Sequence, residues 1–186
     1  MRKVIKIVIT GNVGTGKSTL SQFLISEGYH VFESDKEVRE VYSLAKVKKE
    51  MILNFSKKVK ELTLKNGNIN LINLGKFVFE NTQELEILEN IIYPYLNDRK
   101  KKFIQKNIDS KIIFFDIPLL FEKKLHPYYD YIIYLRCNFN QVRKRVLQRE
   151  GMTEQKLKNI MKNQIKDISR FNKYISIALD TGKSLA

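Results

Sequence analysis

Short apolar runs alternate along the chain with longer segments in which apolar residues recur at helical spacing. The short runs are rich in Val, Ile, Phe and Tyr and predict buried strands at 4–9, 29–32, 111–116, 131–135 and 174–179. The longer segments predict helices at 17–27, 140–150 and 153–171. Strands separated by helices are typical of a parallel sheet with helices on both faces. We therefore predict an α/β fold with a five-stranded parallel sheet.

The segment from about 36 to 107 departs from this alternation because most of it has helical periodicity. Val38, Val41 and Tyr42 fall on one helical face, and Met51 and Phe55 fall on another. Further helices are predicted at 71–79 and 84–107, after a turn at 65–68. We expect a mostly helical region between the second and third strands.

The clearest motif is Gly-Asn-Val-Gly-Thr-Gly-Lys-Ser at 11–18, between the first predicted strand and the first predicted helix. Strand, glycine-rich turn and helix form the context of a phosphate-binding P-loop. Glycines let successive backbone N–H groups point inward, and the following helix adds the positive end of its dipole. Lys17 is expected to reach the β- and γ-phosphates, and Ser18 to bind Mg²⁺. The residues expected to bind the nucleoside triphosphate are Gly11, Asn12, Val13, Gly14, Thr15, Gly16, Lys17, Ser18 and Thr19.

Two carboxylates follow predicted strands and are expected at the same edge of the sheet as this loop. Asp116 closes the third strand, where P-loop enzymes place an acid that holds Mg²⁺ or its water shell. Asp35 follows the second strand and could orient and deprotonate an acceptor hydroxyl. The alternatives are a turn cap before Pro118 for Asp116 and a helix N-cap for Asp35.

Arg145 and Arg149 lie four residues apart on one face of the helix predicted after the fourth strand, with Arg143 nearby. Guanidinium groups match phosphate oxygens and stabilise charge that develops during phosphoryl transfer. The alternative is a solvated helix face. We expect Arg145 to act in catalysis and Arg149 to contact the nucleotide.

Composition and charge restrict the function further. The chain has 186 residues, which suits one domain, and its one cysteine excludes a disulfide framework. No apolar run approaches the roughly 20 residues of a membrane helix. The net charge of +14 fits nucleic acid, a polyanionic small substrate or a lysine-rich solvated surface. The lysines are spread over expected outer helix faces without interleaved aromatics, which favours the solvated surface.

Several segments together resemble the dephospho-coenzyme A kinase family. They cover nearly the whole chain: 10–19, 31–35 with Arg39, 74–79, 92–94, 116–122, Arg145 to Arg149 with Gly151, Gln164, and 180–182. The most specific match is Asp-Ile-Pro-Leu-Leu-Phe-Glu at 116–122, combined with Val-Phe-Glu-Ser-Asp at 31–35. Asn12 stands where the family usually has glycine, and Tyr93 where histidine is typical.

The resemblance implies a single domain over 1–186 with a three-layer P-loop kinase fold, a coenzyme-binding region at about 36–107 and a lid at about 139–170. It implies ATP- and Mg²⁺-dependent phosphorylation of the ribose 3′-hydroxyl of dephospho-coenzyme A, the last step of coenzyme A synthesis. Asp35 would be the acceptor-activating carboxylate, Ser18 and Asp116 would serve the metal, and Arg145 would lie in the lid.

Two other functions compete with this one. The first is a P-loop kinase for a nucleoside monophosphate or a sugar acid, and the second is a nucleic-acid-binding ATPase, suggested only by the positive charge. We expect a cytoplasmic enzyme, a monomer or weak homo-oligomer, with ATP and dephospho-coenzyme A as substrates and with neither nucleic acid nor membrane as partner.

Overall fold

The computed structural model describes residues 4–165 and 167–182, which form two compact units. The first unit holds the described residues up to Ser34 and from Asn107 onward. The second unit is Asp35–Lys106.

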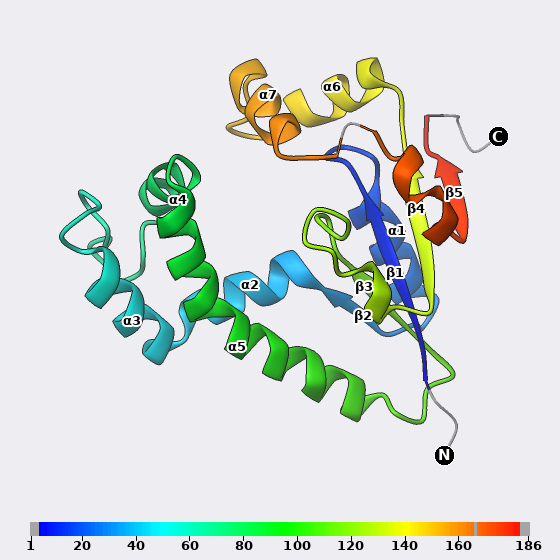
Figure 1. Cartoon of the computed structure of the whole chain (residues 1–186), viewed down its shortest axis with the longest axis horizontal. Helices are drawn as coiled ribbons and strands as arrows, with labels where there is room; N and C mark the ends of the chain where they lie inside the picture. The colour runs from blue at the N-terminus through cyan, green and yellow to red at the C-terminus, as the bar shows by residue number, and fades with distance from the viewer. Residues whose placement is uncertain (1–3, 166, 183–186) are drawn as a thin grey trace. The chain divides into compact units, whose positions relative to one another are not determined.

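The first unit is built on the predicted five-stranded parallel sheet, which is confirmed (Figure 1). The strands follow the spatial order β2-β3-β1-β4-β5, and every neighbouring pair is parallel. Their bounds are β1 (Ile5–Gly11), β2 (Val31–Glu33), β3 (Ile112–Asp116), β4 (Tyr131–Arg136) and β5 (Ile177–Asp180). Because β1 is the central strand, the loop that follows it lies in the middle of the row formed by the carboxyl ends of the strands.

The register of the sheet aligns the carboxyl ends of three strands. Asp116 of β3 pairs with Ile9 of β1 on one side and with Glu33 of β2 on the other. Open parallel sheets bind ligands outside the carboxyl ends of their strands, near the point where the strand order reverses. The chain segments that leave β1, β2 and β3 therefore start from one row.

Helix α1 (Lys17–Ser26) covers one face of the sheet. Leu24 of α1 packs in a buried cluster with Ile9, Phe114 and Leu135 from three adjacent strands. As predicted, Gly28 stands in the C′ position just after the helix, with φ 85°.

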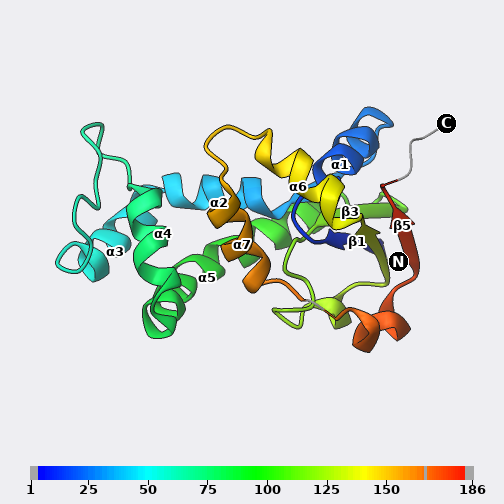
Figure 2. The same ribbon diagram turned by 90° about the horizontal axis from the view of Figure 1, so that it is seen from above.

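Two further helices follow β4, namely α6 (Phe139–Leu147) and α7 (Glu154–Lys162), and they lie side by side in Figures 1 and 2. The predicted helix at 153–171 was too long. The chain leaves the helix after Lys162, because the side chain of Gln164 and the backbone N–H of Ile165 bond to distant segments. Short 3₁₀ turns occupy His126–Tyr128 and Ser169–Tyr174.

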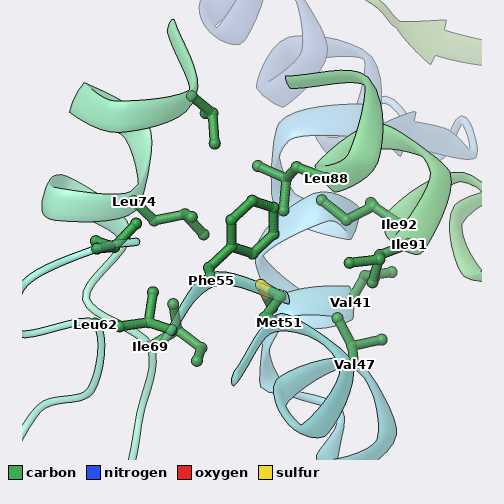
Figure 3. Close-up of a cluster of buried hydrophobic side chains, with 12 residues drawn as sticks. Val41, Val47, Met51, Phe55, Leu62, Ile69, Leu74, Leu88, Ile91 and Ile92 are labelled. Atoms are coloured by element: carbon green, nitrogen blue, oxygen red, sulfur yellow. The ribbon is translucent and has the colours of Figure 1, made fainter. Parts of the chain in front are cut away.

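The second unit is a helical cluster with its own apolar core. Its helices are α2 (Ser34–Ser43, whose first residue belongs to the first unit), α3 (Ala45–Phe55), α4 (Leu71–Phe79) and α5 (Thr82–Lys106). Figure 3 shows the Phe55 ring among Met51, Leu74 and Leu88. Phe55 and Met51 are fully buried, so α3 contributes the middle of this core.

Across 4–165 and 167–182, none of the helices combines the length and the hydrophobicity needed to span a bilayer.

Candidate active site

The turn from the end of β1 into α1 has glycines at positive φ, and a side chain at Gly11 or Gly14 would clash with its neighbours. A Cβ on Gly11 would lie 2.3 Å from the Leu135 carbonyl oxygen of the neighbouring strand. Gly14 has φ 75°, and a Cβ there would lie 2.8 Å from Val146 Cγ2. Asn12 is not among the residues with positive φ, so the usual glycine is not required at that position.

Helix α1 begins directly after the loop, with Gly16 as its N-cap and no side-chain cap. The exposed residues Ser18 and Thr19 form its first turn. Backbone N–H groups in the first turn of a helix have no intrahelical acceptor, and the helix dipole adds positive potential there. The loop and this helix end together favour a bound anion.

The ammonium group of Lys17 donates hydrogen bonds to two carbonyl oxygens of the loop. The distances are 2.6 Å to Gly11 and 2.9 Å to Asn12. The same Asn12 carbonyl accepts from Thr15 Oγ1 at 2.8 Å. The cation is therefore held against the loop, as phosphate binding requires.

Asp116 ends β3 and is 9% exposed. Its Oδ2 accepts a hydrogen bond from Ser21 Oγ at 3.2 Å. Because Ser21 is three residues after Ser18, their side chains occupy the same face of α1. Ser18 therefore offers a hydroxyl one helical turn from the serine that bonds to Asp116, and hydroxyl and carboxylate oxygens are donors that suit Mg²⁺.

Arg145 of α6 links the phosphate loop to the segment after β5. Its guanidinium donates to the Gly14 carbonyl at 3.4 Å and to the Thr181 carbonyl at 2.8 Å. The Thr181 hydroxyl in turn donates to the Thr15 carbonyl at 2.9 Å. Arg149 lies beyond the end of α6, and its guanidinium is exposed and unpaired among the described residues.

Asp35 lies in the first turn of α2, two residues after the end of β2. Its side chain is exposed. The helix begins one residue earlier, at Ser34, so the alternative that Asp35 is its N-cap is wrong. Asp35 belongs to the second unit and the loop to the first.

Gln164 and Glu122 make contacts near the loop that their place in the sequence did not indicate. Gln164 Oε1 accepts a hydrogen bond from the Val13 N–H at 3.0 Å, and Glu122 Oε1 accepts one from the Ile165 N–H at 2.9 Å. Burial raises the pKa of Tyr134, and the nearby negative charge of Glu122 raises that pKa further. Gln164 and Glu122 both lie in segments that match the family, and that match was the only indication in the sequence of a role for them.

The family model and the curated relatives that match this chain name the same family. The family model described as dephospho-CoA kinase matches residues 5–183. The dephospho-CoA kinase of Fusobacterium nucleatum subsp. nucleatum is 33% identical over 167 residues, which covers 90% of this chain and 84% of the relative.

Two solved structures share the fold. The structure of TT1252 from Thermus thermophilus has a TM-score of 0.86 at 24% identity and covers 99% of this chain and 92% of its own. The dephospho-CoA kinase of Campylobacter jejuni has a TM-score of 0.68 at 26% identity, covering 97% and 89%.

Proposed function

Because the chain belongs to the dephospho-CoA kinase family, we propose that it transfers the γ-phosphoryl group of ATP to the ribose 3′-hydroxyl of dephospho-coenzyme A. The observation that carries the proposal is the phosphate loop at the end of the central strand. The metal-site candidate Asp116 ends the adjacent strand, where it pairs with Ile9. The products are coenzyme A and ADP.

The loop and Lys17 bind the phosphates of the donor. The amides of the loop and of the first turn of α1 donate to phosphate oxygens, and Lys17 neutralises charge on the β- and γ-phosphates. Its present bonds to the Gly11 and Asn12 carbonyls keep the ammonium beside these amides. Glycine-rich loops of this kind contribute by positioning and by electrostatic stabilisation rather than by covalent chemistry.

Ser18 and Asp116 would hold Mg²⁺, directly or through its water shell. Their oxygen donors fit this ion, and Ser21 fixes one carboxylate oxygen of Asp116 from the same helix face. When bound, the ion neutralises charge on the phosphate oxygens during transfer.

Asp35 is the carboxylate that we propose to orient the acceptor hydroxyl and accept its proton. Its support is its place in the chain, two residues after the strand that pairs with the Asp116 strand. Arg145 and Arg149 supply cationic groups for the charge that develops on the transferred group. Arg145 does so from its position on the Gly14 carbonyl, and Arg149 from an exposed position.

The direct test is incubation with ATP, Mg²⁺ and dephospho-coenzyme A, followed by mass measurement of the product. A mass increase of one phosphoryl group on dephospho-coenzyme A supports the proposal. A panel with nucleoside monophosphates and sugar acids tests the competing kinases, and faster turnover of any of these would overturn the choice of substrate.

Asp35→Asn tests the role of the carboxylate. Turnover should fall by about 10²–10⁴-fold, the usual value of general base catalysis, while ATP binding stays near wild type. Glu40→Gln on the same helix is the matched control, because Glu40 is also exposed and lies one and a half turns away. Unchanged turnover in Asp35→Asn would remove this residue from the mechanism.

A further inference from the structure

The peptide unit between Asn12 and Val13 is held at both of its polar ends. Its carbonyl oxygen, on Asn12, accepts hydrogen bonds from Thr15 Oγ1 at 2.8 Å and from Lys17 Nζ at 2.9 Å. Its N–H, on Val13, donates to Gln164 Oε1 at 3.0 Å. Because a peptide unit is planar, the bond on one side fixes the direction of the group on the other. Gln164 therefore helps to orient the carbonyl that holds the Lys17 ammonium.

The side chain of Val13 is also held in place, by packing against apolar residues. It packs against the buried cluster formed by Val142 and Val146 of α6 and Leu157 of α7. The backbone of Gly14 fits closely over Val142 and Val146, as the short Cβ distances show. The helix pair α6–α7, visible in Figures 1 and 2, thus supports the loop through side-chain packing as well as hydrogen bonding.

Gln164 itself is fixed by its neighbours. It follows the last turn of α7, where its N–H donates to the Met161 carbonyl at 3.3 Å. The next residue, Ile165, donates its N–H to the Glu122 carboxylate at 2.9 Å. Glu122 belongs to the segment that follows Asp116 and β3. The segment 164–165 is therefore bonded on one side to the phosphate loop and on the other to the segment that follows the candidate metal carboxylate.

We propose that Gln164 is a positioning residue for the donor phosphates, acting through the Asn12–Val13 peptide and Lys17. This inference rests on the proposed use of ATP. Without the Gln164 acceptor, the peptide loses the bond at its N–H end and is held only through its carbonyl, by Thr15 and Lys17. The Asn12 carbonyl then places the Lys17 ammonium less firmly beside the loop amides. Removing the Gln164 acceptor should therefore weaken nucleotide binding and leave the binding of the acceptor substrate unchanged.

The test measures ADP binding by calorimetry, without acceptor, for Gln164→Met, which keeps the side-chain length and removes the oxygen. The dissociation constant should rise about 3- to 10-fold, the range to which the net value of one hydrogen bond converts. The KM for ATP should rise in parallel, and the KM for dephospho-coenzyme A should stay within about twofold. Asn163→Ala is the matched control, because this adjacent side chain is exposed and makes no hydrogen bond among the described residues.

Two more variants separate positioning from a general structural role. Gln164→Asn withdraws the oxygen by one methylene and should weaken ADP binding as Gln164→Met does. Gln164→Glu restores an acceptor and should bind ADP close to wild type at about 0.5 M salt, where its added charge is screened. ADP binding by Gln164→Met at the wild-type level would overturn the proposal, as would an equal rise in both KM values with no rescue by Gln164→Glu.

The outcome is distinct from that of the proposed function. A wild-type protein that binds ADP but leaves dephospho-coenzyme A unmodified contradicts the proposed function, and the ADP measurements still decide the role of Gln164. A wild-type protein that does not bind ADP overturns both.

Discussion

Replacing Gly14 by alanine tests whether packing against α6 fixes the phosphate loop. An added Cβ would lie 2.8 Å from Val146 Cγ2 and 3.1 Å from Val142 Cγ1, and both valines are buried. A non-glycine residue in the left-handed region costs about 1–2 kcal/mol, and overpacking a core site costs about 1–3 kcal/mol more. We expect Gly14→Ala to lower the free energy of unfolding by about 2–5 kcal/mol.

Alanine variants of two other glycines separate the cost of backbone strain from the cost of the steric clash with the valines. Gly28 has φ 85° and open space where a Cβ would lie, so Gly28→Ala should cost only the backbone strain of about 1–2 kcal/mol. Gly16 has φ 91° and its nearest neighbour, Thr181, is 3.9 Å away, so Gly16→Ala adds the same strain within the loop. The difference between the Gly14 and Gly28 variants isolates the contact with the two valines.

The assay is urea unfolding without nucleotide, together with ADP binding by calorimetry. Val146→Ala removes one of the clashing methyl groups, so the double variant Gly14→Ala/Val146→Ala should be more stable than the sum of the two single effects predicts. The reasoning is refuted if Gly14→Ala is no less stable than Gly28→Ala and binds ADP with wild-type affinity.

Two further predictions concern residues outside the loop. Phe55→Ala should lower the free energy of unfolding by about 3–5 kcal/mol, because Phe55 is fully buried in the helical cluster. Thermal or urea unfolding measures this loss. The control is Leu53→Ala, at an 82% exposed position of the same helix, which should change the free energy of unfolding by no more than about 0.5 kcal/mol. Tyr129 is largely buried and its hydroxyl has no hydrogen-bond partner among the described residues, and this burial raises the pKa of Tyr129 far above 10. The unfolded tyrosine ionises near pH 10 and the folded one later, so stability is unaffected below that pH and falls above it. Tyr129→Phe keeps the ring against Phe115 and should weaken this fall in a pH series of unfolding measurements. An equally steep fall in the variant would assign it to other groups.

The strands were predictable where both faces of the sheet are buried. Ile113, Phe114 and Phe115 are all buried, so β3 is a continuous apolar run in the sequence. The end of α7 was not predictable from periodicity, because it depends on bonds from 164–165 to residues 43 and 151 positions away. Local spacing carries no information about such partners.

The same distinction applies to the candidate site. The phosphate loop is a local motif, so a run of consecutive residues is enough to recognise it. The role of Arg145 was predicted from its charge and its helix, but its bonds to Gly14 and Thr181 span 131 and 36 residues. The roles of Asp35, Asp116 and the two arginines stay predictions.

The fixed positions of the loop motif serve phosphate binding, whereas its variable positions contact other segments of this protein. Gly11, Gly16 and Lys17 meet requirements that any phosphate-binding loop of this type imposes. Val13, which the motif leaves open, is the residue that packs into the α6–α7 cluster and bonds to Gln164. Substitutions at the variable positions should therefore alter nucleotide affinity through the supporting helices, even though the motif itself is unchanged.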